Sequence, residues 1–413
     1  MENGKPTFLF LKYGMGIGGI EIYIERLARW LMDNQYKVVF LALKGTEIHP
    51  DFIDVFNGPL AEIREVDIHS LNWVKKLKGL FDEEELIIAY AFDLYQYAML
   101  EKLKIKLHLK RMNSFYWIPH FEEVFLEDKY PRPFRKAMGF YFGKIIKKLD
   151  SNRNIIYVND SHLKAFEKRY RFHSSFGSDM LIQAWRCMPP AFDETEMKER
   201  SRRKPFNILT IGRFTFPHKA YLLGLIEAYG QLKEKYSDIT LTIIGYGKDK
   251  DEVISKVAAL SEKAQNDVSL TGEVAPSELR NYFRNASVHI GVAGCILDSA
   301  YHGVISVPVR HYTYKCEGYG YFTDINKIDQ LVDSKPGIEI ERYIEELIKM
   351  STEDYVELCR KTQEVFKQDK AYGNFGKKEM GQRNVNSCKH LPKCFIFFVQ
   401  SRYIAAGLWH RLK

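Results

Sequence analysis

The chain has 413 residues, of which 46% are hydrophobic and 28% charged, and its formal net charge is +8. A single hydrophobic core rarely grows beyond roughly 250–300 residues, so this length predicts two domains. The composition excludes a disordered or low-complexity chain, and the positive charge favours anionic partners such as phosphates or a lipid headgroup surface.

The amino terminus, MENGKPTFLFLKYG, lacks the basic segment, long apolar core and cleavage site of a secretory signal, and its pattern predicts a first strand. No stretch reaches the roughly 18–20 apolar residues that span a bilayer. The six cysteines show no metal-binding spacing, which suits free thiols in a reducing compartment. We therefore expect a cytoplasmic protein without a metal site.

The first half of the chain predicts a doubly wound parallel sheet. The apolar run Thr7–Leu11, a glycine loop, a helical pattern and the run Lys37–Leu43 form a βαβ unit. Further strands are expected at Glu62–Ile68, Leu86–Ala91, Ile105–Leu109 and Asn154–Asn159.

The glycine loop lies between the first strand and the first helix. Gly14, Gly16 and Gly19 fit the spacing G-x-G-x-x-G, in which backbone N–H groups at a helix N-terminus meet phosphate. The next strand ends in LALK at Leu41–Lys44 without an acidic residue, so the ribose recognition of NAD-binding domains is not supported. A tight strand-to-helix turn without a ligand is the alternative.

The polar stretch Cys187–Pro205 contains three prolines and predicts a linker. Beyond it, apolar runs alternate with helical patterns, which predicts a second Rossmann-like domain. We expect an N-terminal domain at 1–186, the linker at 187–205, and the second domain at 206–370. The segment 371–413 is expected to return to the first domain as a helix or to serve as a surface anchor. Strands of the second half are expected at Phe206–Ile211, Ile239–Gly245, Val268–Leu270, Val288–Val292 and Val304–Val309.

Two permanent cations follow the first strand of the second half. Gly212 closes that strand, and Arg213 and Lys219 lie six positions apart in the loop that enters the next helix. Ligands of open parallel sheets bind beyond the carboxyl ends of the strands, so a planar guanidinium and an ammonium there predict a clamp for a diphosphate. The alternative is a pair of solvated surface cations.

Two later loops carry further candidates. Thr271 and Gly272 follow the predicted strand Val268–Leu270, where backbone groups can meet a nucleobase. Gly294 precedes a helix that bears Asp298, and an acidic side chain in the first turn of that helix can accept ribose hydroxyls while nearby N–H groups meet phosphate. The alternative is that Asp298 only stabilises the N-terminus of its own helix.

The order of four segments resembles that in the GT-B retaining glycosyltransferases of family 4. These segments are GGIE at Gly18–Glu21, G-R-x5-K at Gly212–Lys219, ITLTIIGYG and GCILDSAYHGV. The resemblance implies an α/β fold of two Rossmann-like doubly wound domains that face an interdomain cleft. It also implies retaining transfer of a hexosyl group from a nucleotide diphosphate sugar to an acceptor hydroxyl, with no cofactor besides the donor substrate.

The resemblance also assigns roles to individual residues. In such enzymes a glycine loop approaches donor and acceptor, an arginine and a lysine bind the diphosphate, and an acidic residue contacts the ribose. The first of two family glutamates is missing here because Ile290 stands at its position, and Glu317 in the following loop is the candidate substitute. The residues that match the other roles are Gly18, Gly19, Arg213, Lys219 and Asp298.

The acceptor side offers two candidates for an acid or base. Asp93 follows the predicted strand Leu86–Ala91, and His120 lies in the aromatic segment FYWIPHF. Structural roles are the alternative for both, since in the resembled family the departing phosphate is thought to take the acceptor's proton.

Residues Phe115–Leu149 are rich in aromatic and basic side chains, which suits an anionic membrane surface and a lipid-linked acceptor. The alternative is an amphipathic helix that packs in the core with a solvated basic side.

The predicted function is transfer to a glycan or lipid-linked intermediate of surface polysaccharide synthesis, by a cytoplasmic enzyme with a peripheral position on the inner face of the cell membrane. Two alternatives stay open, namely a nucleotide-sugar epimerase of the same architecture and a non-catalytic nucleotide-sugar-binding partner, which the missing glutamate favours. Nucleic acid is not an expected partner, because no recognised binding motif accompanies the positive charge.

Overall fold

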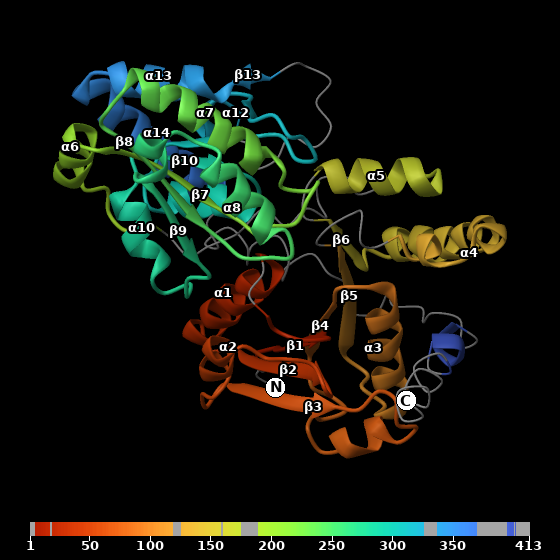
Figure 1. Ribbon diagram of the computed structural model, residues 1–413. Helices are drawn as coiled ribbons and strands as arrows, with labels where there is room; N and C mark the ends of the chain where they lie inside the picture. The colour runs from red at the N-terminus through yellow and green to blue at the C-terminus, as the bar shows by residue number, and fades with distance from the viewer. Residues whose placement is uncertain are drawn as a thin grey trace. The chain divides into compact units, whose positions relative to one another are not determined.

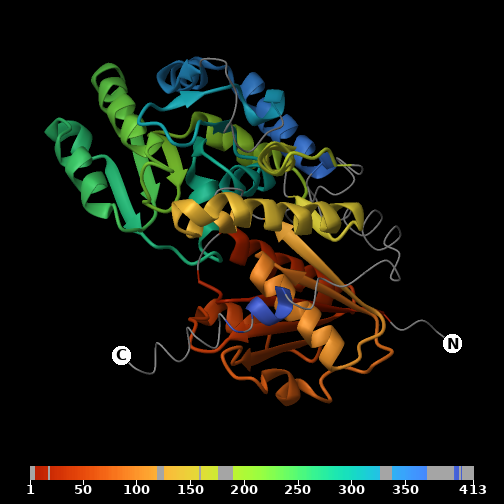
Figure 2. The same ribbon diagram turned by 90° about the vertical axis from the view of Figure 1, so that its right-hand side faces the viewer.

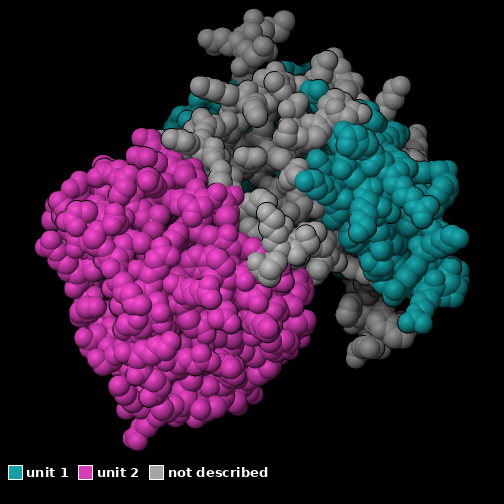
Figure 3. Space-filling model, turned by 90° about the horizontal axis from the view of Figure 1, so that it is seen from above, with its two compact units in different colours: residues 1–183, 375–413 teal, residues 184–374 magenta. Residues whose placement is uncertain are grey.

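The computed structural model describes residues 5–16, 19–118, 125–157, 160–174, 189–325, 337–369, 395–399 and 401. The chain divides into two compact units, which Figure 3 colours separately. Unit 1 comprises Met1–Gln183 with Phe375–Lys413, and unit 2 comprises Ala184–Asn374. Each unit contains its own parallel sheet flanked by helices (Figure 1), so the predicted α/β fold with two Rossmann-like domains is confirmed.

The sheet of unit 1 has the strand order β3-β2-β1-β4-β5-β6, and all its pairs are parallel. Because helices cover both faces of the sheet, β1 and β2 are almost entirely buried and are nearly continuous apolar runs. The strands are β1 Thr7–Lys12, β2 Lys37–Leu43, β3 Ala61–Val66, β4 Ile87–Ala91, β5 Met112–Ile118 and β6 Ile155–Tyr157.

The helices of unit 1 lie on both sides of this sheet, with α1 and α2 on one side and α3 on the other (Figure 1). In α1 the residues Tyr23, Ile24, Leu27 and Leu31 recur at helical spacing and are buried. The helices are α1 Gly19–Asp33, α2 Pro50–Val55, η1 Trp73–Leu77, α3 Leu94–Lys106, η2 Leu126–Lys129, α4 Arg132–Ser151 and α5 Asp160–Tyr170.

One strand predicted in unit 1 is wrong. The run Ile105–Leu109 alternates like a strand, but its first two residues end helix α3 and the remainder forms a turn. The strand that follows α3 is β5, Met112–Ile118, in which every residue is buried. A strand buried on both faces is recognised by a continuous apolar run, and in β5 Asn113 and Ser114 interrupt that run.

Part of the C-terminal segment packs on unit 1. Residues 395–399 are helical and are drawn in blue in Figure 2. The ring of Phe395 lies 5.8 Å from that of Tyr141 and 6.3 Å from that of Phe142, both in α4. Phe395 is buried by these contacts, whereas Phe397 is 74% exposed.

The sheet of unit 2 has the strand order β11-β10-β7-β8-β9, and its pairs are also parallel. A separate antiparallel pair joins β12 to β13. The strands are β7 Phe206–Ile211, β8 Ile239–Ile244, β9 Val268–Gly272, β10 Val288–Gly291, β11 Ser306–Pro308, β12 Glu317–Gly318 and β13 Ile338–Glu339.

The core of unit 2 joins the central strands to helices α7, α13 and α14. Helix α6 lies within the stretch predicted as a linker and is anchored to unit 2, because the buried guanidinium of Arg200 donates to the carbonyl oxygen of Gly303 at 3.2 Å. The helices are α6 Glu194–Arg202, α7 Tyr221–Lys235, α8 Lys250–Ala258, α9 Glu262–Gln265, α10 Leu279–Asn285, α11 Gly294–Tyr301, α12 Phe322–Ile325, α13 Ile340–Lys349 and α14 Thr352–Asp369.

Candidate active site

The strand order of unit 2 places a topological switch point at β7. The chain continues from β7 to β8 on one side of it, whereas β10 pairs with β7 on the other side. In open parallel sheets the loops that leave two such neighbouring strands in opposite directions flank a crevice in which ligands bind. Here the loop after β7 contains Arg213 and Lys219, and the loop after β10 leads into α11 at Gly294.

Backbone hydrogen bonds hold the loop after β7 against the loop after β8. The N–H of Gly212 donates to the oxygen of Ile244 at 2.9 Å, and that of Phe214 donates to the oxygen of Tyr246 at 2.7 Å. The carboxylate of Asp249 accepts from the N–H of Phe216 at 2.6 Å. The loop that carries the two predicted cations is therefore fixed to the end of β8 and to the loop that follows it.

Glycines allow these loops to pack closely. A Cβ atom on Gly245 would lie 1.9 Å from the carbonyl oxygen of Gly212, which is far inside van der Waals contact. The N–H of Gly245 donates in turn to the oxygen of Gly272 at 2.9 Å. The backbones beyond β7, β8 and β9 thus form one packed layer that no larger residue at position 245 could enter.

Lys219 lies directly over the backbone at the end of β7. A Cβ on Gly212 would be 3.1 Å from the Lys219 Nζ, so the glycine makes room for the ammonium group. Burial lowers the pKa of Lys219 below the usual range of lysine, and the charge of Arg213 adds to this against an opposing effect of Cys295. The ammonium has no carboxylate partner among the residues that the structure describes, which leaves its charge available to an anion.

Arg213 is exposed and rests on Tyr246, from the loop after β8. Its Nη2 donates to the Tyr246 hydroxyl at 3.4 Å, and its Cζ lies 5.7 Å from the centre of the tyrosine ring. Arg213 is also close enough to Lys219 to lower the pKa of that lysine. The structure therefore brings the two predicted cations together beside the switch point.

The loop after β10 is backbone-strained and enters helix α11. Ala293, which precedes the helix, has a φ of +59°, a value that is uncommon for a residue other than glycine and often found at functional sites. Gly294 is the first residue of α11, so its N–H points out of the positive end of the helix. This end can contribute to binding an anion next to Lys219 and Arg213.

Asp298 does not lie where the sequence predicted it. Helix α11 begins at Gly294, so Asp298 is the fifth helical residue, in the second turn, and it is 5% exposed. The prediction of a first-turn carboxylate was wrong because the helix starts earlier than the small residues suggested. Asp298 is close enough to His289 to raise the pKa of that imidazole.

His289, in β10, is a buried neutral imidazole beneath this loop. Burial lowers its pKa to about 3, and the positive charge of Lys219 adds to that while Asp298 opposes it. Its Nδ1 lies 3.0 Å from the hydroxyl of Ser299 in α11. The ring therefore ties β10 to α11 and fixes the loop between them.

The remaining donor-side candidates lie further along the sheet. Thr271 and Gly272 end the edge strand β9, where the hydroxyl of Thr271 donates to the oxygen of Ile243 at 3.3 Å. Gly272 has a φ of +75°, which suits glycine. Glu317 starts β12 and pairs with Glu339 of β13, and no contact within the described residues joins it to Arg213 or Lys219.

The unit 1 candidates lie at the switch point of their own sheet, where β1 is flanked by β2 and β4. Gly19 is the first residue of α1, after β1, and Asp93 follows β4. Asp93 accepts from the N–H of Gln96 at 2.7 Å and so caps α3, as the alternative reading of this residue expected. Gly18 and His120 lie outside the described residues.

Two features are absent from the described residues. No group of three or more His, Cys, Asp or Glu side chains there could hold a metal ion. None of the described helices is both long and apolar enough to cross a membrane.

Part of unit 2 matches a known protein family. Residues 192–291 match the family model described as Glycosyl transferases group 1, and this span contains both cations and the strands from β7 to β10. This part of unit 2 is similar to a glycosyltransferase group 1 domain. The predicted enzyme class, glycosyltransferase, is thereby confirmed.

Solved structures support the same fold over nearly the whole chain. The Anabaena protein HepE in complex with UDP and glucose is 12% identical, with 97% of this chain and 98% of that chain covered and a TM-score of 0.58. A glycosyltransferase from Rickettsia africae is 13% identical, with 91% and 98% covered and a TM-score of 0.54. An α-glucosyltransferase in complex with UDP is 11% identical, with 91% and 99% covered and a TM-score of 0.53. These likenesses establish the GT-B fold, and no curated protein matches the chain.

Sequence reasoning missed three residues of this glycosyltransferase domain. Tyr246, which holds Arg213, and Gly245, which admits the loop after β7, both lie in the quoted run ITLTIIGYG, and their place after a strand was the available signal. His289 offered no such signal, because a histidine within an apolar run is most often a core residue.

Proposed function

We propose that the chain transfers a hexosyl group from a nucleoside diphosphate sugar to a hydroxyl of a glycan or lipid-linked acceptor, with retention. The observation that carries the proposal is Lys219, a partly buried ammonium over Gly212 beside the switch point, with its pKa lowered by burial. A desolvated cation without a carboxylate partner in the described part of the chain suits a ligand that brings negative charge. A diphosphate fits this requirement.

The charges act on the leaving group. As the bond between sugar and diphosphate breaks, negative charge grows on the departing oxygen, and fixed cations nearby stabilise that change more than they stabilise the bound donor. Lys219 supplies a point charge, Arg213 a planar fork held against Tyr246, and the N-terminus of α11 further N–H groups. The departing phosphate then takes the proton of the acceptor hydroxyl, so this mechanism needs neither a metal nor a cofactor.

The proposed donor to test first is UDP-glucose. Two of the similar structures contain UDP and one of them also contains glucose. Recognition of the nucleoside is assigned to the strand end at Thr271 and Gly272, and recognition of the ribose to Asp298.

The residues expected to contact the sugar of the donor favour a second candidate function. Ile290, at the position of the first family glutamate, is fully buried in the core of unit 2, so it cannot contact a sugar. Glu317 is the proposed substitute. If no residue replaces that glutamate, the chain is a non-catalytic nucleotide-sugar-binding partner of another transferase.

The proposed acceptor lies at an anionic membrane surface on the cytoplasmic side, as in the synthesis of surface polysaccharides. Helix α4 carries six basic residues, and its one acidic residue, Asp150, is buried. Phe134 and Phe140 are 61% and 68% exposed, and the Lys144 ammonium lies 4.4 Å from the ring centre of Phe140. Exposed aromatic rings among cations suit the headgroup region of anionic lipids.

The test begins with binding and ends with products. UDP is expected to raise the thermal midpoint of the full chain, because a ligand that binds only the folded state stabilises it. Arg213→Gln should lower that shift, whereas Lys263→Ala, an exposed lysine on α9, should leave it unchanged. Product analysis with UDP-glucose and a glycan acceptor then distinguishes transfer from epimerisation, which needs no acceptor, and from binding alone. No shift with any nucleoside diphosphate would contradict the proposal.

A further inference from the structure

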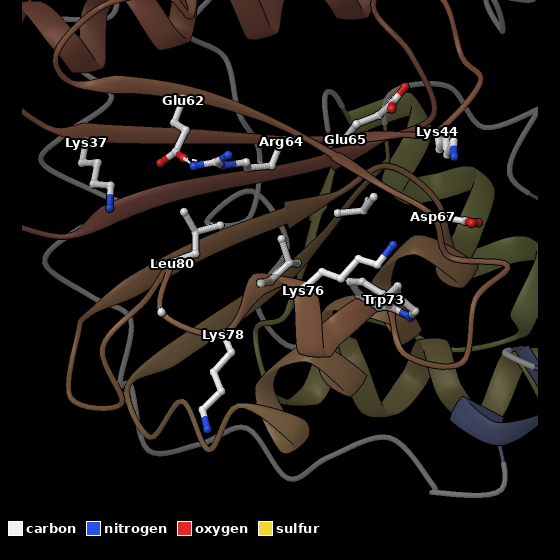
Figure 4. A pocket seen from close by; sticks show the side chains of 13 residues that line it. Lys37, Lys44, Glu62, Arg64, Glu65, Asp67, Trp73, Lys76, Lys78 and Leu80 are labelled. Atoms are coloured by element: carbon white, nitrogen blue, oxygen red, sulfur yellow. Dashed lines mark hydrogen bonds and ion pairs between the residues drawn. The ribbon is translucent and has the colours of Figure 1, made fainter.

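Unit 1 carries a hollow beside its edge strand that no part of the proposed function uses (Figure 4). Its volume is about 660 Å³, within the roughly 300–1,000 Å³ of ligand sites. Strands β2 and β3 line one side, and η1 with the turn that follows it lines the other. Strand β3 is an edge strand that pairs only with β2, so nothing in the sheet covers its outer side.

The hollow has an apolar wall. Val66, Trp73 and Leu77 line it and are almost completely buried. Glu62 and Arg64 of β3 stand in register with Val39 and Leu41 of β2, so their side chains leave the sheet on the face that carries this wall. A ligand there would meet apolar side chains at its base and charges around it.

Cations outnumber carboxylates around the hollow. Two of the three carboxylates are engaged, because Glu62 pairs with Arg64 at 2.5 Å and Asp67 accepts from the N–H of His69 at 3.2 Å. Glu62 is neutralised by Arg64, so the negative charges of Glu65 and Asp67 oppose four lysines. None of these lysine ammonium groups has a hydrogen bond or ion pair with any residue for which the structure gives a position. The four lysines are Lys37, Lys44, Lys76 and Lys78.

The lysines are spread along the strand instead of gathered at one point. Lys37 begins β2 and Lys44 directly follows its end, so their backbones are separated by about 23 Å at the usual rise of a strand. Figure 4 shows the lysines distributed around the hollow. A single phosphate would reach one or two of them, whereas an extended chain with several anionic groups would reach all four.

We propose that this hollow binds a segment of an acidic glycan. Single-stranded nucleic acid, the other common polyanion, is held by aromatic rings on which its bases stack. The one aromatic side chain that lines the hollow, Trp73, is 1% exposed and offers no such platform. Hydroxyl-rich sugars with carboxylate groups suit a partly apolar wall rimmed by ammonium donors. The site is independent of the donor chemistry proposed for unit 2.

The test uses the full chain and a defined probe, an octamer of galacturonic acid. Isothermal calorimetry at low salt measures the binding of this octamer. We expect one binding site, and we expect Lys76→Ser combined with Lys78→Ser to weaken binding at least about tenfold. The matched control is Lys106→Ser combined with Lys168→Ser, which removes the same charge from exposed positions of α3 and α5 and should change affinity less than about twofold. Circular dichroism checks that both variants fold.

Four results would overturn the proposal. Equal weakening in the two double variants would mean a response to net charge alone. Equal or tighter binding of an eight-residue single-stranded DNA would assign the hollow to nucleic acid. Absence of binding to the octamer would remove the site, and a UDP shift in the same preparation would leave the proposed function untouched. A neutral maltooctaose that binds as well as the acidic octamer would exclude the role of the lysines.

Discussion

The first strand of each unit lies at the switch point of a parallel sheet, but the lysines at or beyond the ends of these two strands differ in their partners. In unit 1, β1 ends at Lys12, whose ammonium pairs with Glu21 of α1 and donates to the oxygen of Gly14 at 3.2 Å. In unit 2, β7 is followed by Lys219, which has no carboxylate partner within the described ranges. Both loops leave a switch point of a parallel sheet, so the fold does not distinguish them.

This difference predicts that an anion binds beside Lys219 of unit 2 and not beside Lys12 of unit 1. A lysine that is already neutralised gains little from a diphosphate, whereas a desolvated lysine without a counter-charge gains much. The glycines differ in part. Gly245 of unit 2 is packed against backbone, and so is Gly14 of unit 1, where a Cβ would lie 2.7 Å from the carbonyl oxygen of Glu47. A Cβ on Gly16 or Gly19 of unit 1 would instead meet nothing within 4 Å. Unit 1 therefore has open space at the start of α1, beyond the packed Gly14.

The largest expected effect is on Lys219. Lys219→Ala should lower kcat/KM for transfer. The expected loss of transition-state stabilisation is about 2–4 kcal/mol, because the variant lacks a preorganised charge that the departing diphosphate needs. Steady-state kinetics with UDP-glucose measure this, and Lys12→Ala in unit 1 is the comparison, with a smaller expected loss because that lysine is already paired. Equal losses in both variants would erase the contrast between the two units.

The next largest effect is expected from Gly245→Ala, which should lower the stability of unit 2. The new Cβ would lie 1.9 Å from the Gly212 oxygen, so the loops after β7 and β8 would have to separate. Overpacking of this kind costs about 1–3 kcal/mol, which corresponds to a fall of about 2–12 °C in the thermal midpoint of a unit of this size. Calorimetry measures the midpoint. An unchanged midpoint with intact UDP binding would show that the packed glycine layer does not hold the site.

The third prediction concerns pH. Because burial lowers the pKa of Lys219, its positive charge is lost at a lower pH than in an ordinary lysine, and UDP affinity should fall several-fold as pH rises through that lowered value. The stability of the unliganded chain should change in the opposite sense. A charged, desolvated lysine costs stability, and this cost disappears as pH rises from the lowered pKa toward the ordinary one.

Titration calorimetry between pH 7 and about 10 checks this, with Lys219→Arg as the control. A guanidinium keeps its charge through the range, so the affinity of that variant should not vary with pH. A pH profile shared by both proteins would place the titrating group elsewhere.

Most of the alternating strands and helices of the fold could be predicted from the sequence. Buried strands such as β1, β2 and β7 are short apolar runs with helical patterns between them, and the sheet edge where Arg213 and Lys219 lie follows from that alternation. Strand β5 was missed because Asn113 and Ser114 interrupt its apolar run although both are buried. Their burial is a property of the sheet and cannot be read from the run itself.

Contacts between loops could not be predicted in the same way. Tyr246 meets Arg213 because β8 lies beside β7, and His289 approaches Lys219 because β10 lies on the other side. Strand order fixes these neighbours, and residue spacing along one chain does not encode that order. The position of Asp298 was wrong for a smaller reason, since α11 begins at Gly294 and not after it, which places Asp298 in the second turn.

The smallest stability effect should come from Gly19→Ala, and it tests the open space in unit 1. Gly19 begins α1, and a Cβ there would touch nothing within 4 Å, so the free energy of unfolding should change by less than about 0.5 kcal/mol, or rise slightly because alanine is the better helix former. If a substrate approaches this backbone, the same methyl group should raise KM for the acceptor about tenfold while UDP binding stays unchanged. Full activity would instead make the glycine loop a tight turn without a ligand, as its alternative interpretation holds. A loss of stability like that of Gly245→Ala would mean that the two loops are packed alike, and the charges alone would then distinguish the units.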